Sequence, residues 1–183
     1  MNASSKTNAS NDNIFTNMMA SRKLSLPVAN AGGSIKEKLE DVLAKSIEGK
    51  CAVEGYVKFG STKIHSYSSG ILNGERVSFQ VVFECDVCNP VEGMQIKCVA
   101  RNVTKAGIRA TTTDKPSPVV IFVARDHHTD VPYFSTVQAE QQIIVKVIGQ
   151  RFELNDEYVS IIAEIVIPKT TKKKNKKKLM IEN

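Results

Sequence analysis

The residues from Asn89 to Thr112 constrain the fold most, because they mark a boundary and then a hairpin. Pro90 cannot donate a hydrogen bond to a sheet, and Gly93 lets the backbone turn into a new run of residues. After Gly93, apolar and polar residues alternate through two short stretches that a connection at 104–107 separates. This pattern predicts the opening hairpin of a small antiparallel barrel and separates an earlier unit from everything that follows.

Three more strands are predicted after this hairpin. They are expected at Val119 to Val123, Ile143 to Ile148 and Tyr158 to Ile167. A long connection from Ala124 to Gln141, with one helical turn, separates the first two. Five strands with a long connection between the third and the fourth are the order of an OB-type barrel.

Before Asn89, the sequence predicts a helix on one face of a small antiparallel sheet, so the chain reads as α+β and then all-β. An edge strand ends at Pro27, and a helix begins after Ser34, which is expected to form a capping box with Glu37. Gly49 is a natural end for this helix. The strands are expected at Cys51 to Phe59, Thr62 to Tyr67 and Val77 to Cys85.

Two apolar features of this first unit indicate contacts with other proteins. Gly70 to Gly74 is expected to be a loop that exposes Ile71 and Leu72, so we expect Gly70, Ile71 and Leu72 to dock into a partner. The alternative is a surface turn with incidental aliphatic residues. The strand through Val81, Val82 and Phe83 is apolar on both faces, which one small helix cannot cover. These residues are therefore expected to contact a partner subunit that binds along the junction between this unit and the barrel.

The net charge of +6 comes from the end of the chain. Residues 169–183 hold seven Lys and one Glu, whereas the 18 basic and 18 acidic residues before them balance. We expect residues 1–13 and this lysine tail to be disordered. The tail increases solubility, attracts phosphates or directs the protein to the nucleus.

Composition and motifs argue against membrane, secreted and catalytic classes. The longest apolar stretches fall far short of the roughly 20 residues of a membrane span, and residues 1–13 do not resemble a secretory signal. Cys85 and Cys88 are a lone C-x-x-C motif; zinc would require other ligands to converge, so buried thiols are the expected alternative. The possible further ligands are Cys51, Cys98, His127 and His128. His127 and His128, with Asp126 and Asp130, are expected to lie in a solvated loop rather than in a metal or acid–base cluster. We therefore expect no catalytic residue, metal or cofactor.

The chain resembles the seventh-subunit, or stalk, family of multisubunit DNA-directed RNA polymerases, which has eukaryotic, archaeal and giant-virus members. The resemblance covers about residues 14–166 and depends on the order and spacing of several segments. These are Leu39 to Gly49 followed by Cys51, Gly55 to Val57, Gly70 to Leu72, Val77 to Val81, Pro90 to Gly93 and Val103 to Gly107. The ending at Ile165 to Lys169 and the lysine tail depart from cellular members and favour a large DNA virus member.

The resemblance implies a truncated RNP-like tip domain at 14–88 and an S1-type OB domain at 89–168. It also implies a non-catalytic stalk subunit that pairs with a second stalk subunit, docks on the polymerase core near the clamp and binds nascent RNA during transcription. Such a subunit would be nuclear if cellular, and in the virion and cytoplasm if viral. No membrane partner is implied.

The OB-type order predicts where single-stranded RNA would bind. In this fold the ligand face consists of the second and third strands and two adjoining loops. Those places hold Lys105, Arg109, Phe122, Arg151 and Phe152, although Phe122 could instead belong to the core. The alternative function is a free-standing S1-type RNA-binding protein, and co-purification with polymerase would distinguish the two.

Overall fold

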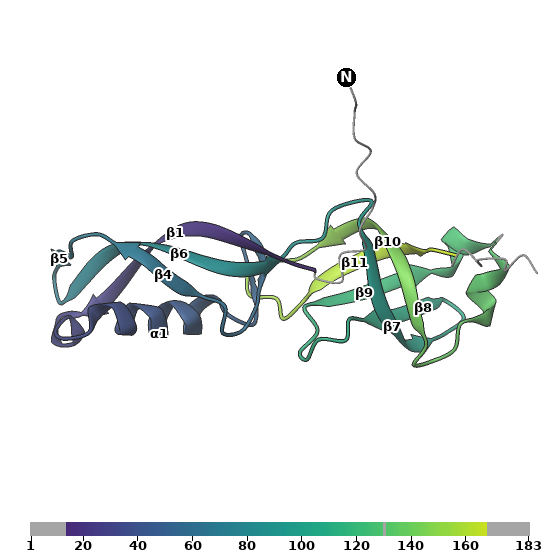
Figure 1. Cartoon of the computed structure of the whole chain (residues 1–183), viewed down its shortest axis with the longest axis horizontal. Helices are drawn as coiled ribbons and strands as arrows, with labels where there is room; N and C mark the ends of the chain where they lie inside the picture. The colour runs from purple at the N-terminus through teal and green to yellow at the C-terminus, as the bar shows by residue number, and fades with distance from the viewer. Residues whose placement is uncertain (1–13, 130, 168–183) are drawn as a thin grey trace, which may run out of the picture.

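The computed structural model describes residues 14–129 and 131–167, whose strands form a six-stranded sheet and a closed barrel. The two lie end to end along the long axis of the molecule (Figure 1). The expectations of disorder for 1–13 and for the lysine tail fall outside the described residues. In the described part, no helix is both long enough and apolar enough to span a membrane.

The first sheet is organised around β6, which pairs with four of its other strands. Its elements are β1 (Phe15–Pro27), η1 (Val28–Asn30), α1 (Ile35–Ile47), β2 (Cys51–Ala52), β3 (Gly55–Val57), β4 (Lys63–Tyr67), β5 (Ile71–Asn73) and β6 (Arg76–Cys88). β1 pairs with β6 along all 13 of its residues, while β3, β4 and β5 share the other edge of β6. The strand expected to end at Pro27 therefore begins at Phe15, earlier than its alternation indicated.

The helix covers one face of this sheet. Leu39, Leu43 and Ile47 recur at every fourth residue and are buried with the inward side chains of β6. Val42, also apolar, is 37% exposed. The predicted end at Gly49 is confirmed, because Gly49 has a φ of 72° and follows the last helical turn.

The predicted capping box is wrong. Ser34 makes no side-chain hydrogen bond to the first turn of α1. Instead, Lys38 Nζ donates to the carbonyl oxygens of Asn30 and Gly32, at 3.1 Å and 2.7 Å. A lysine one turn into the helix therefore holds the preceding loop, a role that the capping motif did not indicate.

The barrel is closed by five strands, a topology compatible with an OB-type barrel. Its elements are β7 (Gln95–Val103), β8 (Gly107–Thr111), β9 (Val119–Ala124), η2 (Arg125–His128), η3 (Pro132–Thr136), β10 (Gln142–Arg151) and β11 (Val159–Ile165). β9 and β11 are parallel, and the other pairs are antiparallel. The long connection contains two short 3₁₀ helices where one turn was expected.

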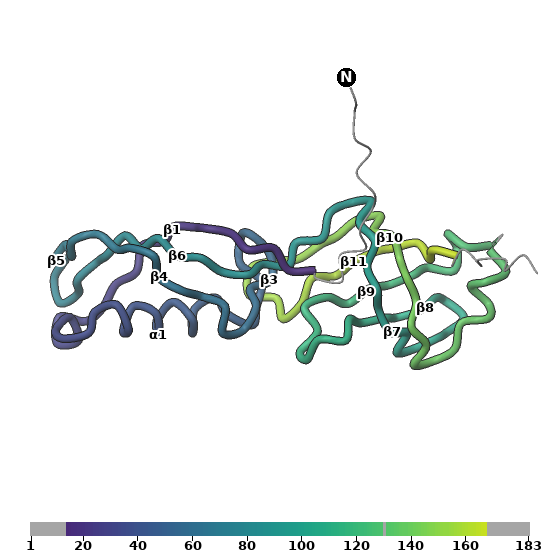
Figure 2. Tube along the Cα trace, viewed as in Figure 1, coloured from purple at the N-terminus to yellow at the C-terminus, as the bar shows by residue number. Residues whose placement is uncertain are grey.

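The end of the first sheet and the barrel share one apolar cluster. Ile14, Tyr56 and Cys88 are buried together with the inward residues of the barrel. The loop between β10 and β11 also joins the two parts through the main chain of Cys51. The Cys51 N–H donates to the Asp156 carbonyl oxygen at 2.7 Å, and the Cys51 carbonyl oxygen accepts from the Asn155 N–H at 2.8 Å. Figure 2 shows the trace of this loop beside the β2–β3 segment.

Candidate docking hairpin and nucleic-acid groove

The tip hairpin consists of β5 and the beginning of β6, residues 70–78, at the end of the first sheet that is far from the barrel (Figure 1). The sequence predicted a loop here, but residues 71–73 form a strand because their main chain pairs with β6. Ile71 and Leu72 are 69% and 67% exposed. They pair with Ser78 and Val77, so their side chains lie on opposite faces of the sheet. A partner that buries both must enclose the hairpin.

The shape of the tip hairpin depends on Gly70. A Cβ atom there would lie 2.5 Å from Val77 Cγ1 and 2.9 Å from Phe79 Cε1, so only glycine fits without movement. Val28 lies beside the turn of the hairpin, where its N–H donates to the Glu75 carbonyl oxygen at 2.9 Å. Val28 is 47% exposed and adds a third aliphatic side chain. No local sequence pattern indicates this position of Val28, because it depends on pairing between distant segments.

The three residues expected to contact a second subunit do not share a face. Val81 and Phe83 are fully buried in the cluster that α1 covers. Val82 lies on the opposite, open face of the sheet and is half-buried there. Met19 is exposed on the same open face. The helix α1 therefore covers the face that holds Val81 and Phe83. Of the three predicted residues, only Val82 lies on a face that a partner could reach.

The groove on the barrel is about 590 Å³ in volume and crosses four strands. Strand register places Arg109 on β8, Phe122 on β9, Ile162 on β11 and Gly149 on β10 in one row. Gly149 contributes no side chain, which leaves the end of this row open. The lining residues are Arg109, Val120, Phe122, Gly149, Gln150, Arg151, Tyr158, Ser160, Ile161 and Ile162.

The groove combines exposed apolar side chains with two guanidinium groups. Phe122, Tyr158 and Ile162 are 41%, 38% and 51% exposed, so Phe122 is not a core residue. Arg109 and Arg151 are exposed beside them, and Arg151 Nη2 lies 2.9 Å from a carboxylate oxygen of Glu153. An aromatic face can stack a base, and a guanidinium can bind a phosphate in a bidentate manner.

Two of the five residues predicted for RNA binding lie outside the groove lining. Lys105 is in the turn between β7 and β8, where its carbonyl oxygen accepts from Arg125 Nε at 2.6 Å. Phe152 is half-buried and packs against the barrel core. The sequence missed Tyr158 and Ile162, although Ile162 alternates with buried Ile161 along β11, so period-two counting could have found it.

The cysteines and the histidine pair do not form a metal site in the described residues, which contain no group of three or more suitable ligands. All four thiols are buried, and burial raises the pKa of Cys51 and Cys85 to about 11 and of Cys88 and Cys98 to about 12. They are protonated near neutral pH and behave as small apolar groups.

The histidines differ from the predicted solvated loop. His127 is exposed, but His128 is buried and stacks on Phe134. Its Nδ1 lies 2.6 Å from the Ala124 carbonyl oxygen, and its Nε2 accepts from the Ile165 N–H at 2.9 Å. His128 therefore holds the long connection against β11. Asp130 lies outside the described residues.

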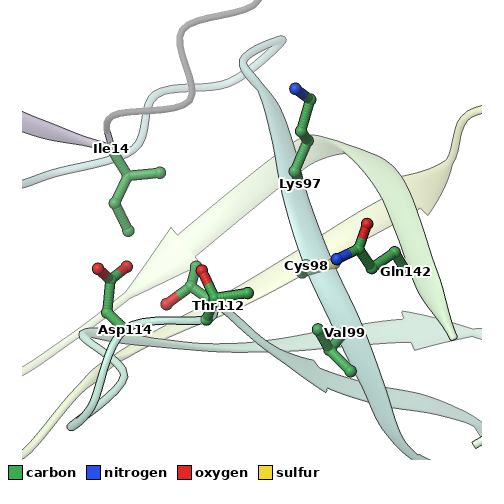
Figure 3. A pocket seen from close by; sticks show the side chains of 8 residues that line it. Ile14, Lys97, Cys98, Val99, Thr112, Asp114 and Gln142 are labelled. Carbon is green, nitrogen blue, oxygen red and sulfur yellow. The ribbon is translucent and has the colours of Figure 1, made fainter. Parts of the chain in front are cut away.

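A further pocket of about 200 Å³ lies between the beginning of β1 and the barrel. Figure 3 shows Ile14 above Asp114 and Thr112 at one side of this pocket, with Gln142 on the other. Thr112 is hydrogen-bonded to Ser117, and every buried side-chain nitrogen and oxygen in the described residues has a partner. Nothing in its lining selects a particular ligand.

A closed barrel with a basic and aromatic groove is typical of proteins that bind single-stranded nucleic acid. Similarity to known proteins indicates a narrower class than the fold and the groove do. The chain is 25% identical over 174 residues to DNA-directed RNA polymerase II subunit 7 of Arabidopsis thaliana, an alignment that covers 81% of this chain and 97% of the relative. It is 24% identical over 159 residues to DNA-directed RNA polymerase II subunit RPB7 of Glycine max, covering 78% and 88%.

A viral relative gives a similar result. The chain is 23% identical over 160 residues to a protein described as putative DNA-directed RNA polymerase subunit L376 of Acanthamoeba polyphaga mimivirus, covering 79% and 78%. No protein-family model matches the chain. These relatives confirm the resemblance to the seventh-subunit family of DNA-directed RNA polymerases.

Proposed function

We propose that this protein is a non-catalytic stalk subunit of a multisubunit DNA-directed RNA polymerase. The relatives are polymerase subunits by name, and their alignments with this chain include most of both proteins. In this proposal, residues 14–88 are a truncated RNP-like tip domain and residues 89–168 are an S1-type OB domain.

The observation that carries the proposal is the exposure of Ile71 and Leu72 at the far end of the first sheet. Each side chain would gain roughly 1.5 to 3 kcal/mol from full burial in a partner. We propose that the tip hairpin enters a pocket of the polymerase core beside the clamp. A free-standing RNA-binding protein has no use for such a hairpin.

We propose that a second stalk subunit binds the open face of the first sheet. Val82 and Met19 are the apolar groups there, among polar neighbours such as Ser21 and Gln80. Protein interfaces typically have an apolar core and a polar rim, and this face offers both kinds of side chain. The pair would then form a heterodimer before it joins the polymerase.

We propose that the groove binds nascent single-stranded RNA. Arg109 and Arg151 would contact phosphates, and Phe122 would stack a base. Residues 90–168 carry nine acidic and eight basic side chains, so the barrel has no strong positive field of its own. Attachment near the RNA exit channel would supply the local concentration that weak binding requires.

Purification of the native protein under mild conditions tests the stalk assignment. We expect polymerase core subunits to co-purify, because the tip hairpin is expected to be buried in them. Purification without them, with RNA alone, would support the free-standing RNA-binding protein instead.

A further inference from the structure

Another hollow lies at the junction between the first sheet and the barrel, and it is separate from the groove. Its volume is about 170 Å³, and none of the described residues lines both sites. It is lined by Phe15, Tyr56, Lys58, Phe59, Asp114, Lys115 and Pro116. The first four residues come from the first sheet or the turn after β3, and the last three from the loop between β8 and β9.

Phe59 is an exposed aromatic side chain in this hollow, with 57% of its surface accessible. Its ring rests on Gly49, where a Cβ atom would lie 1.9 Å from the ring. The Glu48 carboxylate accepts hydrogen bonds from the Gly60 and Thr62 N–H groups, which fixes the turn after Phe59. The ring is therefore held in place while much of its surface remains open to solvent.

Charged side chains of both signs lie at this hollow. Lys58 Nζ is 5.1 Å from the centroid of the Phe15 ring, and the main-chain N–H of Lys58 donates to the Asp86 carbonyl oxygen at 3.0 Å. Lys115 is exposed on the opposite side, and Asp114 supplies a negative charge. Aromatic surface beside lysines is the combination that binds single-stranded nucleic acid.

The size of the hollow restricts what it can hold. Pockets for free small-molecule ligands are usually about 300 to 1,000 Å³, which is larger than this hollow. The volume of this hollow suits one unit of a polymer whose other units bind elsewhere on the protein. An extended strand offers a base and a phosphate in each unit.

We propose that the hollow at Phe59 is a second contact for single-stranded RNA, in which Phe59 stacks a base and Lys58 and Lys115 bind the adjoining phosphates. This inference rests on the proposed binding of RNA by the groove. One strand would then contact both the barrel and the junction, which lengthens the bound segment beyond the barrel.

Binding of labelled oligouridylates to the full chain at low salt tests this inference. We would use lengths of about 4 and about 16 nucleotides, which span the usual site sizes of one OB fold. Phe59→Ala and Lys115→Glu are the junction variants, and Phe122→Ala is the groove variant. Val53→Ala and Lys36→Glu are matched controls at exposed positions outside the hollow, the groove and the proposed partner surfaces.

We expect each junction variant to weaken binding of the longer oligonucleotide by about five-fold or more and to leave the shorter one unchanged. Phe122→Ala should weaken both lengths. If both junction variants bind the longer oligonucleotide within two-fold of the parent while Phe122→Ala loses affinity, the second contact is wrong and the groove stands.

Two other outcomes also decide the matter. If the parent binds neither oligonucleotide, RNA binding by the groove fails and this inference fails with it. If Lys115→Glu and Phe59→Ala leave RNA binding intact but reduce recovery of polymerase subunits, the hollow holds a protein side chain instead of RNA. Circular dichroism of Phe59→Ala checks its fold, and Lys115→Glu supplies a second variant on an exposed loop.

Discussion

The first sheet and the barrel are both built from strands, but they use their faces differently. The first sheet buries one face under α1 and leaves the other open, so a side chain such as Val82 lies outside a core that its neighbour Val81 enters. The barrel closes on itself and buries its inward residues without an α-helix. An open sheet face and an exposed hairpin suit a protein partner, whereas the outer wall of a closed barrel leaves room for an extended strand.

The largest expected effect on stability comes from a substitution on the covered face of the first sheet. Phe83→Ala should lower the free energy of unfolding by about 3 to 5 kcal/mol, because it leaves a cavity in the core beneath α1. Val82→Ala is the matched control on the open face and should cost less than about 1 kcal/mol. Urea denaturation measures both, and equal losses would contradict the assignment of faces.

Alkaline pH tests both regions together. Cys85 in the first sheet and Cys98 in the barrel have pKa values of about 11 and about 12, raised by burial above the ordinary 9.0. Their thiols ionise first in the unfolded chain, so stability present below pH 9 should fall as pH rises toward these values, by about 1.4 kcal/mol per pH unit for each thiol. Denaturation midpoints from pH 8 to 10.5 measure this. Cys98→Ala should reduce the slope, and an unchanged slope would contradict the burial of this thiol.

The tip hairpin offers the next test. Ile71→Asp should remove the protein from polymerase, because a carboxylate cannot enter the apolar pocket that would give isoleucine roughly 1.5 to 3 kcal/mol. Its circular dichroism should not change, since Ile71 is outside the core. Val53→Asp changes another exposed aliphatic and is the control. Retained co-purification of Ile71→Asp would rule out docking through the hairpin.

A smaller effect distinguishes the groove from the rest of the barrel wall. Arg151→Glu should weaken RNA binding more than Lys105→Glu, because only Arg151 lines the groove. Crosslinking to nascent RNA in the assembled enzyme measures the two. A greater loss for Lys105→Glu would move the contact to the β7–β8 turn.

The smallest expected effect concerns the lysine tail. Deletion of residues 169–183 should flatten the dependence of nucleic-acid affinity on salt, because fewer phosphates are neutralised when the tail is absent. On duplex DNA the slope should fall by at most about 0.9 for each phosphate that the tail neutralises. Titrations at several salt concentrations measure this slope. An unchanged slope would assign the tail to solubility or targeting.

Local patterns predicted most elements, and pairing between distant segments explains most errors. The alternation from Val77 to Cys85 identified β6 because the pattern is repeated, and Gly49 correctly marked the end of α1. The strand at Ile71 was missed because its pairing depends on β6. Short strands of this kind have no period of their own.

The groove was predicted in part for the same reason. Arg109, Phe122 and Arg151 followed from the order of strands in an OB-type barrel. Gly149 joins them through the register between β10, β11 and β9, and Tyr158 joins them because it directly precedes β11. The sequence contains neither relation as a local pattern. Lys105 and Phe152 are in the two loops that the prediction assigned to the ligand face, but neither of them lines the groove.

The two main-chain hydrogen bonds of Cys51 have a consequence for how such a chain can change over time. Each uses an N–H or carbonyl group that every residue except proline supplies in full. A substitution at Asp156 therefore leaves both hydrogen bonds available, whereas a substitution at Cys51 must also fit the apolar cluster in which this side chain is buried. Only proline at position 51 or 155, or a change in the length of the β10–β11 loop, would remove this connection directly.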